Sequence, residues 1–362
     1  MLAALSGLPL ASVLLSDLAV AGAAAEETAP VGPTRSGAAT SSPVVLADVA
    51  DVPVGSAAVL DRLWPAEALT GRPEEARIAR RPRPQRAALQ EAPKEAAPAA
   101  SPSPLRGSIR RVDPAEGARV VALTFDLCER ADEASGYDGA IVDVLRQEGV
   151  PATFFAGGSW LRTHPERGLQ LIADPLFQVG NHGWTHGNLR VLTGERAEQQ
   201  IVWVQAEYAL LRQELVARAR AAGIDEAEIA RIPVQPTAFR FPYGTCSAET
   251  LEMPARFGLA AIQWDVISGD AVRGQTAATV ERAVLGDVRP GSIVVCHGNG
   301  RGSGTAAALP KIIAGLRGKG YRFMTIATLL KAGEPVAATD CYERRPHDNG
   351  RYDKLFGEGT GG

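Results

Sequence analysis

The sequence predicts an α/β domain built on a mainly parallel sheet, either open or closed into a barrel. From residue 119 onward, short apolar runs alternate with longer amphipathic stretches, as expected for strands separated by helices. Polar side chains of complementary chemistry directly follow several apolar runs, which is where catalytic groups gather in parallel α/β folds. The stretch is also close to the usual size of a (β/α) barrel domain.

The individual elements follow from the spacing of apolar residues. Apolar residues that recur every three or four positions indicate a helix, and a short continuous apolar run between turn-forming residues indicates a buried strand. We expect strands over 120–125, 152–158, 239–244, 260–266, 292–297 and 321–326. Between them we expect helices over 138–149, 166–175 and 197–223, and a short helix after the last strand.

Composition and charge exclude several classes of protein. The chain has 362 residues, a formal net charge of −3, 45% hydrophobic residues and 22% charged residues. It is too long for a miniprotein held together by disulfides, and it lacks the basic excess of a nucleic-acid-binding protein. Beyond the N-terminus, no apolar run approaches the length of about 18 residues that a transmembrane helix needs. We expect no nucleic-acid partner, and no protein partner is evident.

The N-terminus resembles a secretory signal peptide. Residues 1–25 are apolar, end in three alanines and are followed by two glutamates. No basic residue precedes Arg35, and Asp17 interrupts the apolar run, so a disordered Ala-rich tail is the alternative. A signal peptide implies a secreted or periplasmic protein, tethered to the membrane if the leader is not cleaved.

The composition divides the rest of the chain into three parts. Residues 26–106 are rich in Pro and Ala, which predicts a low-complexity and largely disordered linker. A catalytic domain is expected over 107–345 and a tail over 346–362. All four cysteines lie beyond the linker and could form two disulfides in three connectivities, or remain buried thiols.

Several polar residues mark a candidate site. Asp126 ends one expected strand, His297 ends another, and Arg240 and Asp270 lie close to two more. One polar strand end could simply cap the next helix, but four with complementary chemistry indicate a shared crevice. His182 and His186 have an i, i+4 spacing that can direct both imidazoles at one metal ion. Hydrogen-bonding structural histidines are the alternative.

Five motifs follow one another along the chain: LTFD (123–126), NHGWTH (181–186), RFPYG (240–244), the segment from Trp264 to Asp270, and VCH (295–297). In this order they resemble the polysaccharide deacetylase family, the NodB-homology carbohydrate esterases of family 4. The resemblance covers about residues 107–335 and implies the distorted (β/α) barrel of that family. It also implies a divalent metal, with zinc expected, and hydrolysis of N-acetyl groups in peptidoglycan, chitin-like oligomers or exopolysaccharide.

The resemblance assigns a role to each of these positions. Asp126 would be the general base, and Arg240 would keep it ionised. His297 would be the general acid that protonates the departing amine, oriented by Asp270. The backbone N–H of Tyr243 would help to bind the oxyanion.

The resemblance also assigns His182 and His186 as metal ligands. Apart from the resemblance, Trp184 and Trp264 have aromatic rings that could bind substrate by stacking on sugars, and the alternative is that they belong to the core.

The first motif departs from the family pattern. The family usually has a second Asp there as the third metal ligand, whereas this chain has Leu127. Glu129 is the expected substitute, and a Cys128 thiolate or Asp126 itself are alternatives. A missing ligand also allows a second interpretation of function, in which the barrel binds glycan without turnover or hydrolyses a different amide.

Overall fold

The computed structural model describes residues 54–82 and 91–356. The expected signal peptide over 1–25 lies outside these residues. Within the described ranges, every helix is too short or too polar to span a lipid bilayer.

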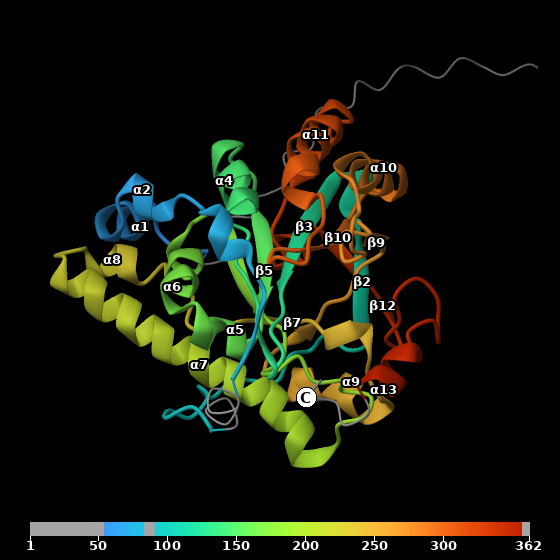
Figure 1. The fold of residues 1–362 in the computed structure, drawn as a ribbon, viewed down its shortest axis with the longest axis horizontal. Helices are drawn as coiled ribbons and strands as arrows, with labels where there is room; N and C mark the ends of the chain where they lie inside the picture. The colour runs from blue at the N-terminus through green and yellow to red at the C-terminus, as the bar shows by residue number, and fades with distance from the viewer. Residues whose placement is uncertain (1–53, 83–90, 357–362) are drawn as a thin grey trace, which may run out of the picture. The chain divides into compact units, whose positions relative to one another are not determined.

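The described chain folds around one large sheet. Its strands are β2 (Ser108–Pro114), β3 (Val120–Leu127), β5 (Ala152–Ala156), β6 (Phe177–Asn181), β7 (Ala238–Phe239), β8 (Ala260–Ala261), β9 (Val266–Ile267), β10 (Ser292–His297), β11 (Arg322–Phe323) and β12 (Gly333–Ala338). They run in the order β12-β2-β10-β3-β5-β6-β7-β8, with β11 beside β3 and β9 beside β10 (Figure 1). A separate pair is formed by β1 (Ala79–Arg80) and β4 (Glu133–Ala134).

The parallel strands curl into a distorted barrel. β3, β5, β6, β7 and β8 pair in parallel one after another, and β10 pairs in parallel with the other edge of β3. The chain then runs from β8 into β9. β9 pairs with β10, the strand beside β3, and this brings the far end of the curled sheet back toward its beginning. β2 and β12 extend the sheet as antiparallel strands. The α/β prediction with a distorted barrel is confirmed.

Helices cover the outer face of the barrel (Figure 1). α10 packs on α11, α11 on α4, and the long α7 on α5 and α6. The helices are α1 (Ala57–Leu63), α2 (Ala66–Leu69), α4 (Gly139–Gln147), α5 (Gly158–Thr163), α6 (Pro165–Ala173), α7 (Gly194–Ala221), α8 (Glu226–Ile229), α9 (Ala248–Arg256), α10 (Ala277–Asp287), α11 (Thr305–Gly318), α12 (Ile326–Leu329) and α13 (Arg351–Leu355), with short 3-10 turns at η1 (Pro73–Ala76), η2 (Ala115–Gly117) and η3 (Pro242–Gly244).

The alternation of side chains along β3 decides which residues reach the barrel interior. Leu123, Phe125 and Leu127 point outward and belong to the core between sheet and helices. Val120 and Ala122 point inward and belong to the smaller interior core. Because successive strand residues face opposite sides, the next interior position after Ala122 and Thr124 is Asp126.

The N-terminal boundary of the folded domain differs from the expected one. Residues 54–82, which the composition assigns to the linker, form α1, α2, η1 and β1. Val59, Leu60 and Trp64 on this segment are buried in the main core. The segment therefore belongs to the folded domain, which begins well before residue 107.

The C-terminal boundary also differs from the expectation. A disulfide joins Cys246 to Cys341, and Cys128 and Cys296 are buried free thiols, which settles the pairing that the sequence left open. Beyond the disulfide, Asn349 Nδ2 donates hydrogen bonds to the carbonyls of Gly244 and Cys341. Part of the expected tail, up to the end of α13, is thereby held against the loop that follows β7.

Candidate active site

The carboxyl ends of the parallel strands surround one cavity of about 370 Å³. Register explains the convergence, because Asp126 on β3 and His297 on β10 are directly paired neighbours. Ala156 on β5 pairs with Asn181 on β6, so the residues that follow these strands emerge at the same edge. The cavity is lined by residues that include Asp126, Cys128, Arg130, Glu133, His182, His186, Tyr243, Trp264, Asp270, His297, Arg301, Tyr352 and Phe356.

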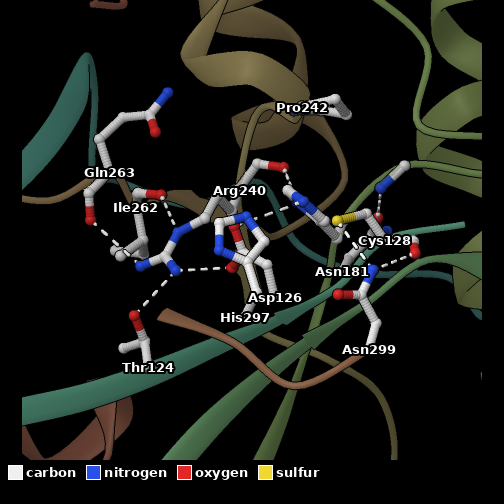
Figure 2. A network of polar contacts seen from close by, with 12 residues as sticks. Thr124, Asp126, Cys128, Asn181, Arg240, Pro242, Ile262, Gln263, His297 and Asn299 are labelled. Carbon is white, nitrogen blue, oxygen red and sulfur yellow. Dashed lines mark hydrogen bonds and ion pairs between the residues drawn. The ribbon is translucent and has the colours of Figure 1, made fainter. Parts of the chain in front are cut away.

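Asp126 is held by a buried guanidinium. Arg240 Nη1 donates to Asp126 Oδ1 at 2.7 Å and to Thr124 Oγ1 at 2.8 Å, and Nη2 donates to the carbonyl of Gln263 (Figure 2). Burial alone would raise the pKa of the Asp126 carboxyl, but the charges of Arg240 and of two nearby histidines outweigh it and lower the pKa. Asp126 is therefore ionised and able to accept a proton.

His297 has the opposite electrostatic setting. Its Nδ1–H donates to Asp270 Oδ1 at 2.9 Å, and its backbone N–H donates to Asp270 Oδ2 at 2.7 Å. Burial alone would lower the pKa of His297, but the charge and hydrogen bond of Asp270 outweigh it and raise the pKa. Thr305 Oγ1 also donates to Asp270 Oδ2, at 2.7 Å, and fixes the carboxylate.

Three donor side chains lie together next to Asp126. One ring nitrogen each of His182 and His186 and the Sγ of Cys128 all lie within 4.8 Å of one another. The Nδ1 of His182 is 2.9 Å from the carbonyl of Arg240. A carbonyl can only accept, so Nδ1 carries the proton and Nε2 keeps a free lone pair.

The protonation of these donors suits a metal ion. Burial lowers the pKa of both histidines, which favours the neutral imidazole that metals bind. Burial and the charge of Asp126 raise the pKa of Cys128 to about 12, so its proton leaves only when a cation replaces it. Two imidazoles and a thiol are donors that fit a divalent transition-metal ion.

Glu129 does not reach this group. Its Oε1 accepts from Thr163 Oγ1 at 2.7 Å and from Arg81 Nη2, and its Oε2 accepts from the N–H of Ser135 at 2.9 Å. The carboxylate is fully buried in the contact between the N-terminal segment and the loop after β3. The structure therefore gives Glu129 a place in packing rather than beside the two histidines.

The two tryptophans have different positions. Trp264 lines the cavity. Trp184 is 2% exposed and lies in the main core against Trp203, with Arg162 over its ring. Gly158 leaves the space for that ring, because a Cβ there would lie 2.1 Å from Trp184. Trp184 is thus a core residue rather than part of the cavity.

Comparison with known proteins identifies the family. The family model described as polysaccharide deacetylase matches residues 113–221. A chitooligosaccharide deacetylase of Sinorhizobium fredii is 32% identical over 216 residues, which are 57% of this chain and 89% of that protein. The chain belongs to the polysaccharide deacetylase family. The resemblance seen in the five sequence motifs is confirmed.

Other members of the polysaccharide deacetylase family match over similar lengths. A peptidoglycan-N-acetylglucosamine deacetylase of Bacillus cereus is 30% identical over 216 residues, which are 59% of this chain and 69% of that protein. The crystal structure of a peptidoglycan N-acetylglucosamine deacetylase with a bound N-oxidanyl-benzamide is 27% identical and superposes with a TM-score of 0.50. It covers 63% of this chain and 95% of that one.

Some cavity residues of this deacetylase-family chain were not predicted from the sequence. Tyr352 and Phe356 come from the expected tail, and the Phe356 ring stacks on Tyr243 with centroids 4.4 Å apart. No local motif marks them, because the disulfide and long-range hydrogen bonds bring them there. His186 and Tyr243 have positive φ angles of 57° and 59°, a strained conformation for side chains of this size that is concentrated at functional sites.

Proposed function

We propose that this protein is a metal-dependent hydrolase that removes N-acetyl groups from a glycan. The observation that carries the proposal is the pairing of Asp126 and His297 on adjacent strands, with opposite shifts in pKa. Two titratable groups whose environments push their pKa values apart can serve as base and acid in the same reaction. Amide hydrolysis needs both, because water must lose a proton and the amine must gain one.

The residues of the cavity divide the reaction between them. Asp126 accepts the proton of the attacking water, whose oxygen forms the new bond to the acetyl carbon. Arg240 holds that carboxylate in place through the 2.7 Å hydrogen bond. His297 donates a proton to the nitrogen as the carbon–nitrogen bond breaks, which releases acetate and a free amine. Asp270 stabilises His297 in the protonated form before the transfer.

His182 and His186 would hold the divalent ion beside this pair. When bound, such an ion supplies Lewis acidity toward the acetyl oxygen and makes water easier to deprotonate. We expect zinc, in line with the nitrogen-rich donors. The backbone N–H of Tyr243 would stabilise the same oxygen, because η3 presents this residue at the cavity wall.

The substrate would be a polymer or oligomer of N-acetylated sugars. The relatives are named as deacetylases of chitooligosaccharide and of peptidoglycan N-acetylglucosamine, and aromatic rings at Trp264 and Tyr352 line the cavity. Peptidoglycan, chitin-like oligomers and exopolysaccharide are the candidates. The Cys246–Cys341 disulfide favours an exported protein, because such bonds persist in oxidising compartments.

An acetate-release screen tests the proposal. The purified zinc-loaded protein is incubated with each of the three glycan classes, beside His297→Ala and Asp126→Asn variants checked for equal metal content. We expect acetate from at least one glycan with the native protein and at least about 100-fold less with either variant. Glycan binding without acetate release from any substrate would instead support a binding protein.

A further inference from the structure

We propose that Cys128 is the third protein ligand of the metal site and binds the ion as a thiolate. The ion would then be held by two imidazoles and one sulfur, a donor set for zinc rather than for oxygen-preferring ions. The inference rests on the proposed function, in that the ion serves the same reaction. It identifies what replaces the carboxylate that Leu127 cannot provide.

Strand geometry places Cys128 on the correct side of the sheet. Leu127 is fully buried in the outer core, away from the cavity. Side chains two positions apart along an extended chain share a face, so Cys128 returns to the side of Asp126. Its Sγ lies within 4.8 Å of one ring nitrogen of each histidine. Ligands of a tetrahedral zinc ion, at bond lengths of about 2.0–2.3 Å, lie roughly 3.5 Å apart, so small side-chain rotations would close the site.

The carboxylates around the cavity serve other purposes. Asp126 Oδ1 accepts from Arg240 at 2.7 Å, and its Oδ2, 3.5 Å from His182 Nε2, is the oxygen left to accept a proton from water. Asp126 therefore has to stay available as the base. Glu133 pairs with Arg130 and Arg301, and moving it to a metal ion would leave two half-buried arginines without their anion, which is costly.

The surroundings of the sulfur suit a bound thiolate. Asn299 Nδ2 donates to the carbonyl of Cys128 at 2.6 Å and approaches Sγ at 3.3 Å (Figure 2). An N–H donor beside a metal-bound sulfur orients it and compensates part of its charge. Asn299 is fully buried, and its side-chain Oδ1 accepts from the backbone N–H of Arg301 at 3.4 Å, which holds the side-chain amide in position. Asn299 is thus a positioning residue for Cys128.

This donor set determines which ions bind. Thiolate is a soft ligand that selects zinc, and the related ion Co²⁺, over Mg²⁺, Ca²⁺ and Mn²⁺. A carboxylate at the same position would accept the harder ions more readily. The chain is therefore expected to take up Zn²⁺ or Co²⁺ tightly and to discriminate against Mn²⁺, and Cys128→Asp should weaken this discrimination.

Cobalt spectroscopy on a Cys296→Ser variant tests the proposal. All four cysteines lie in the described part of the chain, and two of them form the disulfide, so this variant has Cys128 as its one free thiol. Cys296 points into the outer core, away from the cavity. The metal-free full-length variant is titrated with Co²⁺, and we expect a near-ultraviolet thiolate-to-cobalt absorption band that saturates at one equivalent and is displaced by Zn²⁺.

Two further variants complete the experiment. Adding Cys128→Ser should abolish the band and weaken Zn²⁺ binding by more than the about 10- to 100-fold typical of a lost outer-shell contact. Cys128→Asp should bind Co²⁺ without the band, which keeps the test valid if the serine variant does not fold. Stoichiometric Co²⁺ binding without the band in the Cys296→Ser protein would overturn the proposal, and so would no metal uptake.

Activity measurements separate this inference from the proposed function. A native protein that shows the sulfur band but releases no acetate would contradict the deacetylase proposal and support Cys128 as a ligand. Acetate release by a protein that binds one Co²⁺ without the band would support the deacetylase proposal and contradict Cys128 as a ligand. His297→Ala is the matched control, because it should keep the band and lose turnover.

Discussion

Replacing Asp270 by Asn should move the alkaline limb of the pH–rate profile to lower pH. Asp270 is 1% exposed and accepts the Nδ1–H of His297 at 2.9 Å. Two unit charges with centres about 4 Å apart interact by about 4 kcal/mol at an effective dielectric constant of about 20. At about 1.4 kcal/mol per pKa unit, this interaction energy corresponds to a shift of about 3 units. Since neighbouring charges usually shift a pKa by about 1–3 units, we expect the replacement to lower the pKa of His297 by about 1–3 units.

The sign of the effect follows from the role of His297 as a proton donor. It can donate only when protonated, and Asp270 extends the protonated form above the usual pKa of histidine. The native kcat/KM should therefore fall as the pH rises through this raised value, and that of Asp270→Asn should fall from a lower pH. At a pH above both values the variant should be about 10- to 1000-fold slower.

Measuring kcat/KM for acetate release across the pH range checks this prediction. Thr305→Val is the matched control, because it removes a hydrogen bond to Asp270 at 2.7 Å but leaves the charge in place. Its alkaline limb should move much less. Identical alkaline limbs for the native protein and Asp270→Asn, with both rates measurable, would show that His297 is not the acid that controls the limb.

Three further predictions concern the base and the extent of the folded domain. Asp126→Asn should lower kcat by at least about 100-fold in steady-state assays with metal content unchanged, and unaltered turnover would remove its role as base. Replacing Cys246 and Cys341 by Ser opens a link between residues separated by 95 positions and should lower the free energy of unfolding by about 2–4 kcal/mol in denaturant titration. An unchanged midpoint would contradict this. Leu60→Ala in α1 should cost about 2–5 kcal/mol, whereas Leu355→Ala, at a side chain 66% exposed, should cost less than about 0.5 kcal/mol. Equal effects would show that α1 does not contribute to the core.

The convergence of the residues proposed for catalysis could be predicted from the sequence because it depends on a simple rule. Apolar runs locate the strands, and parallel pairing brings the ends of neighbouring strands to one edge of the sheet. Asp126, Arg240 and His297 each stand at or just after a strand end, so their convergence follows from the topology. Asp270 follows the expected strand over 260–266, but only the family resemblance implied its contact with His297. In the structure that strand is divided into β8 and β9, and Asp270 follows β9, which pairs with β10.

The orientation of residues in loops could not be predicted from the sequence, because it depends on tertiary contacts. Cys128 and Glu129 are adjacent, and which of them faces the histidines depends on partners far away in the sequence. Arg81 binds Glu129 from 48 residues earlier, and Asn299 contacts Cys128 from 171 residues later. The sequence allows Trp184 to be either a sugar-stacking ring or a core residue, and packing against Gly158 places it in the core.

The start and end of the folded domain could not be predicted from the average composition of the flanking segments. Pro and Ala dominate residues 26–106, although the short segment around α1 has a Ser56 cap followed by apolar residues at Val59 and Leu60. A helix of this length is not stable alone and forms because it packs on α6 and α7. The segment after Cys341 likewise has little regular structure and depends on the disulfide for its position.

The central claim is that this protein hydrolyses N-acetyl groups of a glycan. Its most direct test is to incubate the zinc-loaded native protein with an N-acetylated oligosaccharide in water enriched in oxygen-18, and to quantify acetate and free amine by mass spectrometry. We predict one free amine for each acetate, with one solvent-derived oxygen in every acetate. Oligosaccharide that binds and is recovered fully acetylated, across all three glycan classes, would contradict the claim.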